Sequence, residues 1–235
     1  MRRCGGNSLI IIIFKNYTPF LPIPQLSAPG YFFAIRKHMK VLIGCEFSGT
    51  VRDAFRSKGH DAFSCDIIDS DYPSKYHIKD DVLKVIDYLD WDMAIFHPPC
   101  TYLTVSANKW YKDQPARASG ALVGEERRAA RVEAYEFFMM LMNADIKSIA
   151  VENPIGVIST LYRKPDQVIQ PWQFGHNETK ATCLWLKGLP LLKPTNIVSG
   201  REQALHNLPP SKDRWKLRST TYAGIADAMA DQYTR

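Results

Sequence analysis

From position 39 onward, short apolar runs alternate with longer stretches in which apolar and polar residues recur at helical spacing. Short apolar runs between turn residues are typical of buried strands, and the helical spacing is typical of amphipathic helices. This pattern predicts strands at 40–45, 60–66, 91–96 and 146–151, and helices at 51–58, 82–89 and 124–143. Because strands and helices alternate, we expect an α/β fold with a doubly wound, mostly parallel sheet.

The pattern loosens after Gly156, where prolines interrupt short segments. The best strand candidate in this region is 182–186, and the spacing in 222–233 predicts a terminal helix. The first two thirds of the chain account for the predicted sheet. We therefore expect the residues that recognise a substrate to lie in a short region at 155–218.

The chain of 235 residues can bury the core of one α/β domain, which we place at 39–235. Residues 1–38 do not fit the alternating pattern, and we expect a disordered N-terminal extension or an artefact of an upstream start site. This segment contains five basic and no acidic residues, so it supplies most of the formal net charge of +6. Total charge is therefore weak evidence for a nucleic-acid partner, which requires local basic surface.

Basic residues do cluster locally in the second half of the chain. Such clusters can be phosphate-binding surface or merely a solvated face, and both interpretations stay open. The clusters are Arg117, Arg127, Arg128 and Arg131, followed by Arg201, Lys212, Arg214, Lys216 and Arg218.

The five cysteines are odd in number and show no C-x-x-C spacing, which favours a reducing cytoplasm over a disulfide framework or a zinc site. No apolar run approaches the roughly 18 residues that a membrane span requires. The run 9–14 follows two arginines, but no small-residue cleavage pattern comes promptly after it, so we do not interpret it as a signal peptide. We expect a cytoplasmic protein without metal or membrane.

Candidate chemistry follows two of the predicted strands. The tetrapeptide His-Pro-Pro-Cys ends at Cys100, and Glu152 is followed by Asn153 and a proline. Residues just past the carboxyl ends of parallel strands line the ligand crevice of an open α/β sheet. A thiol and a carboxylate brought together there suit attack on C6 of a pyrimidine, with the carboxyl group hydrogen-bonded to N3. The alternative is a buried inert cysteine and a strand-end ion pair.

These two motifs resemble the catalytic and glutamate motifs of the C5-cytosine DNA methyltransferases, and compact phage and prophage members are the most similar. Further matching strings lie at 45–49, 97–104, 175–176 and 182–186, and the similarity runs from about position 39 to the end. The resemblance implies a Rossmann-like, S-adenosyl-L-methionine-dependent methyltransferase. It would transfer a methyl group to C5 of cytosine in DNA through a covalent bond between Cys100 and C6, with Glu152 binding the base.

The resemblance also implies a cofactor site around the first strand. Phe47, Ser48 and Gly49 match the opening of the family's adenosylmethionine motif, although Val51 and Arg52 stand where further glycines are common. We prefer adenosylmethionine to NAD because G-x-G-x-x-G is incomplete.

Three further residues are expected near the cofactor. Asp66, at the end of the second strand, is expected to accept the ribose hydroxyls. Asp81, or its neighbour Asp80, is expected near the adenine amino group, and Pro98 is expected beside the cofactor.

Substrate contacts are assigned to Pro99, Asn153, Thr104, Arg117 and Lys180. The prolines would stiffen the turn that carries the nucleophile, and Asn153 would brace it. The family's Q-x-R-x-R pattern is absent, which leaves Lys180 as the basic candidate beside the base, with Arg163 as a second candidate. The stretch 101–131 resembles the family's mobile loop, which closes over a cytosine flipped out of duplex DNA.

The short recognition region keeps two other functions open. One is a C5-modifying enzyme that acts on a free nucleotide or on single-stranded nucleic acid. The other is a catalytically silent DNA-binding or inhibitor protein on the same fold, against which the presence of both Cys100 and Glu152 argues. Duplex DNA is the expected partner and a monomer the expected state.

Overall fold

The structure, a computed structural model, describes residues 38–209 and 211–235. The N-terminal extension predicted at 1–38 therefore lies, except for His38, outside the described residues, as do Cys4 and the apolar run 9–14. The described residues belong to one compact unit.

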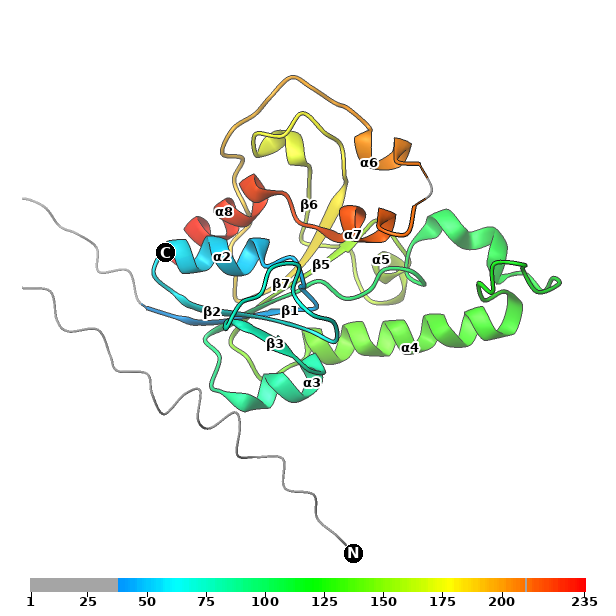
Figure 1. Cartoon of the computed structure of the whole chain (residues 1–235), viewed down its shortest axis with the longest axis horizontal. Helices are drawn as coiled ribbons and strands as arrows, with labels where there is room; N and C mark the ends of the chain where they lie inside the picture. The colour runs from blue at the N-terminus through cyan, green and yellow to red at the C-terminus, as the bar shows by residue number, and fades with distance from the viewer. Residues whose placement is uncertain (1–37, 210) are drawn as a thin grey trace, which may run out of the picture. The chain divides into compact units, whose positions relative to one another are not determined.

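A seven-stranded sheet forms the centre of this unit (Figure 1). Its order is β3-β2-β1-β4-β5-β7-β6, with β1 to β5 parallel and β7 antiparallel to both of its neighbours. This mostly parallel, doubly wound sheet gives the Rossmann-like fold that the sequence predicts. The strands are β1 (Lys40–Gly44), β2 (Asp61–Asp66), β3 (His77–Lys79), β4 (Met93–Phe96), β5 (Ser148–Pro154), β6 (Gln167–Ile169) and β7 (Thr182–Lys187).

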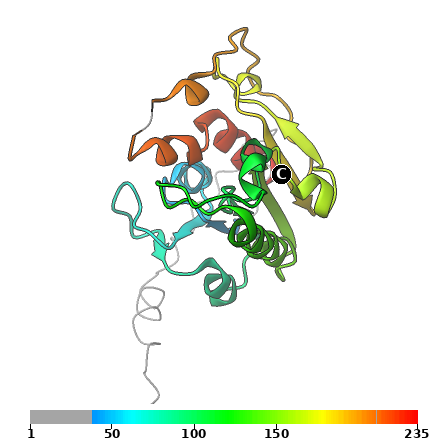
Figure 2. The same ribbon diagram turned by 90° about the vertical axis from the view of Figure 1, so that its right-hand side faces the viewer.

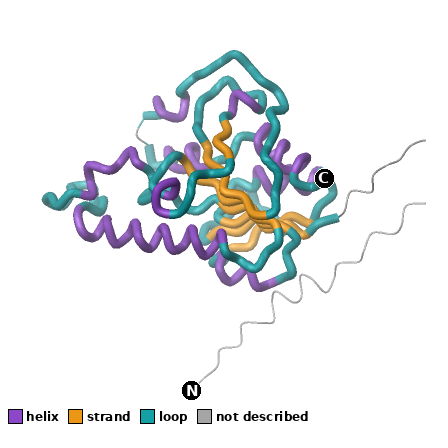
Figure 3. The backbone as a smooth tube through the Cα atoms, turned by 180° about the vertical axis from the view of Figure 1, so that it is seen from behind, coloured by secondary structure: helices purple, strands orange, loops and turns teal. Residues whose placement is uncertain are grey.

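Helices cover both faces of the sheet, as the views from the side and from behind show (Figures 2 and 3). The α-helices are α2 (Thr50–Ser57), α3 (Val82–Val85), α4 (Gly124–Met142), α5 (Ile158–Leu161), α6 (Ala204–Asn207), α7 (Arg214–Ser219) and α8 (Ala223–Gln232). Three 3₁₀ segments are η1 (Ile86–Tyr88), η2 (Val105–Tyr111) and η3 (Pro171–Gln173).

Alternation along β1 explains the two layers of the core. Val41 and Ile43 lie on one face of the sheet and pack in a cluster with α2 and α8, which includes Met229. Leu42 points to the other face and belongs to a cluster with α3 and α4, which includes Phe138. Because successive residues of a strand face opposite sides, a strand covered on both faces is apolar at every position.

The longest helix, α4, has 19 residues and packs the apolar side of its second half against the sheet. Its exposed positions include five charged residues, but Val132 and Met140 are exposed as well. Among residues 38–209 and 211–235, no helix is long and apolar enough to cross a membrane.

The structure corrects several predicted elements. The strand predicted at 146–151 is displaced: β5 runs from Ser148 to Pro154, so Glu152 and Asn153 lie inside the strand and do not follow it. The cause is β7, which pairs Glu152 with Leu184 and extends the ladder to Pro154. The helix predicted at 82–89 divides into α3 and η1.

Strand register brings three chain segments to one edge of the sheet. Gly44 at the end of β1 pairs with Phe96 at the end of β4, and Phe96 pairs with Val151 in β5. The turn after β1, the motif after β4 and Glu152 therefore start from neighbouring positions. The candidate site lies at this edge.

Candidate active site

The turn after β4 is tied to β5 by a buried hydrogen bond. The side-chain amide of Asn153 donates to the carbonyl oxygen of Pro98 at 2.9 Å, and only 1% of Asn153 is exposed. This bond supplies the brace that we predict for Asn153. Pro98 is buried and Pro99 is exposed.

A second connection joins the segments that follow the two motifs. Thr104 forms an isolated antiparallel bridge with Gly156, and the amide of Val157 donates to the carbonyl of Leu103 at 2.8 Å. The approach is so close that a Cβ on Gly156 would lie 2.2 Å from the Leu103 oxygen. Thr104 thus lies where the predicted substrate loop meets the segment after Glu152.

Glu152 is held by a histidine that the sequence did not assign to the site. The Nδ1 atom of His97 lies 3.2 Å from Oε2 of Glu152, and the exposed fractions of the two side chains are 7% and 16%. Burial alone would raise the pKa of the Glu152 carboxyl, but the hydrogen bond to His97 and the charges of Lys180 and His97 outweigh it and lower that pKa. Oε1 accepts no hydrogen bond from the residues that the structure describes.

Cys100 is half-buried beside this carboxylate. Burial raises the pKa of its thiol, and the charge of Glu152 raises it further. Lys180 and Arg218 act in the opposite direction, because their positive charges favour the thiolate. The structure thus brings together Cys100, Glu152 and Lys180, and it adds Arg218 from α7.

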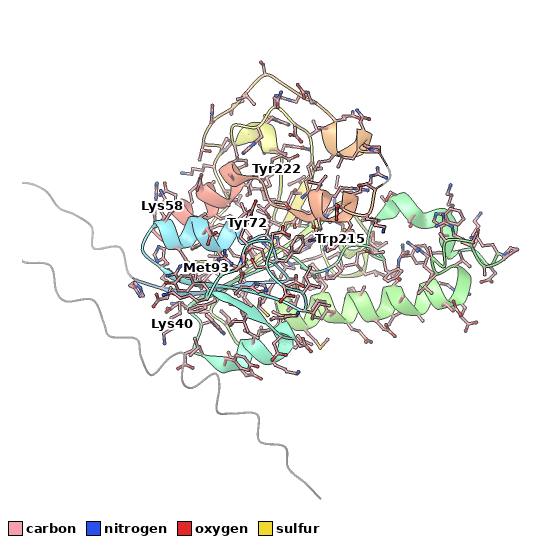
Figure 4. All side chains as sticks on the ribbon, viewed as in Figure 1. Lys40, Lys58, Tyr72, Met93, Trp215 and Tyr222 are labelled. Carbon is pink, nitrogen blue, oxygen red and sulfur yellow. The ribbon has the colours of Figure 1, made fainter. Side chains whose placement is uncertain are left out.

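A hollow opens beside Glu152. Lys180 lines it, and its Nζ donates to the carbonyl of Thr220 at 3.2 Å. Figure 4 labels Tyr222, which lies just ahead of α8 and donates a hydrogen bond to Glu178. The residues lining the hollow are His97, Glu152, Lys180, Thr182, Thr221, Tyr222, Ile225 and Met229.

The turn after β1 is organised by Glu46, a second residue that the sequence did not assign to the site. This carboxylate is buried and accepts hydrogen bonds from the backbone amides of Val51, at 2.7 Å, and Arg52, at 3.3 Å. These amides belong to the first turn of α2, so Glu46 fills the helix N-terminus. Ser48 also donates to Glu46 at 3.3 Å.

Gly49 adopts a left-handed conformation at φ 74° and caps α2. Arg52 folds beneath it, and a Cβ on Gly49 would lie 2.2 Å from Nη2 of Arg52. The buried guanidinium also donates to Asp53 at 2.7 Å and to Ser64 at 2.9 Å. Arg52, which departs from the glycine-rich pattern, therefore supports the turn from below.

The predicted acidic residues lie around the same turn. Asp66 ends β2 and accepts a hydrogen bond from the amide of Ile68 at 3.2 Å, and burial raises the pKa of its carboxyl. Asp81 caps α3, with one oxygen accepting from the amide of Leu83 at 3.0 Å. The carboxylate of Asp80 is engaged by Lys84 and Tyr88, which leaves Asp81 as the better candidate of the two.

Helix α7 reaches the turn that follows β1. The ring of Phe47 is buried and lies 5.4 Å from that of Trp215, while Lys216 pairs with Asp71 at 3.2 Å. Figure 4 labels Trp215 on α7 and Tyr72 on the loop after β2. A segment expected only to recognise substrate thus also covers the turn at 47–49.

The stretch 101–131 differs from the predicted mobile loop. Arg127, Arg128 and Arg131 belong to α4. Arg127 donates to the carbonyl of Thr101 at 3.3 Å, and Arg131 donates to the carbonyl of Tyr102 at 2.9 Å. These two hydrogen bonds fix the segment just after Cys100 to α4. Arg117 does lie on the loop, with its guanidinium 3.8 Å from the centre of the Trp110 ring.

Arg163, the second basic candidate, is engaged elsewhere. It pairs with Asp166 at 2.8 Å and donates to the carbonyl of Leu186 in β7 at 3.3 Å. Among the described residues, no group of His, Cys, Asp and Glu side chains is arranged to hold a metal ion. The four cysteines of that part of the chain are free thiols.

Searches against known protein families and against curated proteins find no match to this sequence. Among solved structures, the chain resembles a prophage-encoded E. coli protein described as a DNA modification methyltransferase, with 14% identity, a TM-score of 0.42, and coverage of 73% of this chain and 55% of that one. It also resembles the S. pombe methyltransferase Dnmt2, with 15% identity, a TM-score of 0.40, and coverage of 66% and 51%. The chain spans about half the length of these two proteins. Likeness at this level does not bear on activity, which has to be argued from the site.

Proposed function

We propose that the protein is an S-adenosyl-L-methionine-dependent methyltransferase that modifies C5 of cytosine in DNA through a covalent bond between Cys100 and C6. One observation carries the proposal. The brace from Asn153 to Pro98 sets Cys100 close enough to Glu152 for the carboxylate to raise the pKa of the thiol, and Lys180 lies beside both. Nucleophile, base-binding carboxylate and cation thus share one edge of the sheet.

The turn after β1 fits adenosylmethionine better than a dinucleotide. A pyrophosphate needs the free amides of a helix N-terminus, but Glu46 already occupies those of α2. Burial raises the pKa of Glu46, so what disfavours a phosphate there is the two amides that this carboxyl group already occupies. Adenosylmethionine, when bound, supplies an electrophilic methyl group.

The chain offers groups for each part of this cofactor. Asp66 would bind the ribose hydroxyls and Asp81 would lie near the adenine amino group. Phe47 and Pro98 would flank the ligand, and the left-handed turn at Gly49 lets the backbone approach it closely.

Cys100 and Glu152 perform complementary tasks on the base. The thiolate adds to C6, which makes C5 nucleophilic, and the free Oε1 of Glu152 accepts a hydrogen bond from the exocyclic amine. Lys180 favours the thiolate and supplies a donor near the base. Removal of the C5 proton afterwards expels the cysteine and restores the aromatic ring.

Two surfaces are suited to hold the DNA. On the loop after Cys100, the ring centre of Trp110 lies 4.8 Å from the Lys109 ammonium and 3.8 Å from the Arg117 guanidinium. Helix α7 carries the exposed Arg218 near the thiol. Aromatic and basic side chains together suit phosphate contact and filling of the gap left by a flipped base.

Labelled methyl transfer to duplex DNA, single-stranded DNA, RNA and dCMP tests this proposal. Duplex DNA should be methylated, and DNA containing 5-fluorocytosine should become covalently attached to the protein. Cys100→Ser should abolish both results. Cys183→Ala, which removes another buried thiol in β7, should keep them. Transfer to dCMP or to a single strand alone would identify the alternative substrates, and turnover by Cys100→Ser would contradict the covalent mechanism.

A further inference from the structure

A network of hydrogen bonds connects the turn at Gly49 with the loop after β2. Nη1 of Arg52, whose guanidinium lies under Gly49, donates to Oγ of Ser64 at 2.9 Å. Oγ of Ser64 lies 2.9 Å from Nδ1 of His77, and Nε2 of His77 lies 2.9 Å from the carbonyl oxygen of Ile68. The network therefore runs from α2 through β2 and β3 to the loop that follows β2.

The chemistry of the groups gives the direction of each hydrogen bond. A guanidinium only donates, so Ser64 accepts from Arg52. A carbonyl oxygen only accepts, so Nε2 of His77 donates to Ile68. The hydroxyl hydrogen of Ser64 is left free to point at Nδ1 of His77.

The first half of the network is fully buried. Arg52 is 3% exposed and Ser64 is 0% exposed. Ser64 in β2 pairs with His77 in β3 at one edge of the sheet, so strand register keeps the two residues side by side (Figure 1). Apolar side chains of similar shape could fill the same space at little or no cost in stability. The network is therefore of interest for the positions that it fixes.

The loop after β2 is fixed on both sides. The amide of Ile68 donates to Oδ1 of Asp66 at 3.2 Å, while the carbonyl of the same residue accepts from His77. Further along the loop, the hydroxyl of Ser70 donates to the carbonyl of Phe47 at 2.9 Å. The orientation of the Asp66 carboxyl group thus depends on a loop that His77 holds on one side and the turn after β1 holds on the other.

We propose that His77 is a positioning residue for the cofactor. Through Ile68 it holds the carboxyl group of Asp66 in the orientation that binds the two ribose hydroxyls of adenosylmethionine. The inference rests on the proposed function, in which Asp66 binds the ribose, and extends it to His77 and Ser64, which have no role there. Because His77 acts through Ile68, its loss should weaken the contacts of the ribose hydroxyls and leave those of the rest of the ligand unchanged.

Two ligands separate this role from general support of the fold. S-adenosylhomocysteine carries both ribose hydroxyls, and its 2′,3′-dideoxy analogue carries neither. The ratio of their dissociation constants, measured by calorimetry, therefore reports the contacts of the hydroxyls. In the wild type we expect the analogue to bind about 10–100 times more weakly, the scale for hydrogen bonds to a charged group.

His77→Phe keeps an aromatic ring and removes both hydrogen bonds of the imidazole. It should weaken S-adenosylhomocysteine about five- to tenfold and the dideoxy analogue less than about twofold. His77→Gln, whose side-chain amide can still donate to Ile68, should restore most of the wild-type ratio. His38→Phe is the matched control, because His38 lies beside Asp61 at the opposite end of β2, and it should behave like the wild type.

Ser64→Ala tests the network at a second position. It removes the link between Arg52 and His77 but keeps the hydrogen bond from His77 to Ile68, so the ratio should fall about two- to threefold. Ser64→Ala combined with His77→Phe should lose no more than His77→Phe alone, because both changes act on the same network.

An unchanged ratio in His77→Phe, or an equal loss for the two ligands, overturns the inference. Where that variant does not fold, an unchanged ratio in Ser64→Ala overturns it, and so does a wild type that binds both ligands equally well. These results leave methyl transfer to cytosine intact. If the wild type binds neither ligand and transfers no methyl group, the proposed function fails and this inference fails with it.

Discussion

The side-chain amide of Asn153, in β5, donates a hydrogen bond of 2.9 Å to the carbonyl oxygen of Pro98 in the turn after β4. Both partners are buried, so water cannot replace either one at low cost. The bond fixes the turn that ends in Cys100 relative to the strand that carries Glu152. The distance between the thiol of Cys100 and the carboxylate of Glu152 thus depends on a residue outside that pair.

Asn153→Ala should weaken this coupling. The Pro98 carbonyl loses its donor, and the free energy of unfolding should fall by about 1–3 kcal/mol. Methyl transfer should fall at least tenfold with little change in adenosylmethionine affinity, because only the turn after β4 is released. Urea unfolding, kinetics and calorimetry check the three effects. Asn143→Ala, at an exposed helix end, is the control, and unchanged turnover in Asn153→Ala would remove the brace from the mechanism.

Gly49 and Gly59 form a matched pair for the cofactor turn. Both have positive φ, but a Cβ on Gly59 meets nothing within 4 Å, whereas one on Gly49 lies 2.2 Å from the buried guanidinium of Arg52. Gly59→Ala should therefore show the backbone strain alone, about 1–2 kcal/mol. Gly49→Ala should lose about 1–3 kcal/mol more and should also bind adenosylmethionine more weakly. Equal losses in thermal or urea unfolding would show that Arg52 moves aside freely.

Much of the sheet could be predicted from the sequence because buried parallel strands are apolar at nearly every position. The runs of β1, β2 and β4 are recognisable in this way, and Cys100 follows β4 as the strand-end rule predicts. Glu152 lies inside β5, because the pairing with β7 extends that strand to Pro154. The antiparallel direction of β7 could not be found, because apolar content carries no information on strand direction. β3 and β6 have only three residues each, too few for a period to be recognised.

The site residues that escaped prediction depend on three-dimensional register. His97 lies beside Glu152 because the preceding residues, Phe96 and Val151, are paired in the sheet. The register of that pairing cannot be predicted from either segment alone. Arg218 lies near Cys100 although 118 positions separate them in the chain. Glu46 offered a local signal: an acid a few residues ahead of a helix can accept from its first amides, as it does here.

Asp66 provides a test of the cofactor site. Its carboxylate lies at the carboxyl end of β2, and Oδ1 accepts the hydrogen bond from the Ile68 amide. Oδ2 does not take part in that bond. Asp66→Ala should weaken adenosylmethionine binding by about 1–3 kcal/mol, the scale for losing hydrogen bonds to a charged group. Calorimetry measures the change, with Asp90→Ala at an exposed position as the control. Equal affinity in the two variants would move the ribose contact elsewhere.

A chain that begins at Met39 should fold and turn over substrate. The alternating pattern starts there, and Lys40 is the first residue of β1. Removal of the basic residues before it should leave kcat unchanged and raise KM for DNA at low salt only. A tenfold loss of kcat, or an insoluble product, would mean that the segment 1–38 is required for folding or catalysis.

The reactivity of Cys100 reports the charges around it. Burial and Glu152 raise the pKa of this thiol, so the thiolate is scarce at neutral pH and appears only as pH rises. Alkylation by iodoacetamide should therefore keep accelerating beyond the pH at which an ordinary cysteine, with a pKa of about 8.5, levels off. Lys180→Met removes a positive charge that favours the thiolate, so the rate at a fixed pH near 8 should fall about two- to fivefold. Lys187→Met, at the other end of β7, should leave the rate unchanged. Mass spectrometry of the Cys100 peptide measures these rates, and an equal rate in both lysine variants would mean that Lys180 does not act on the nucleophile.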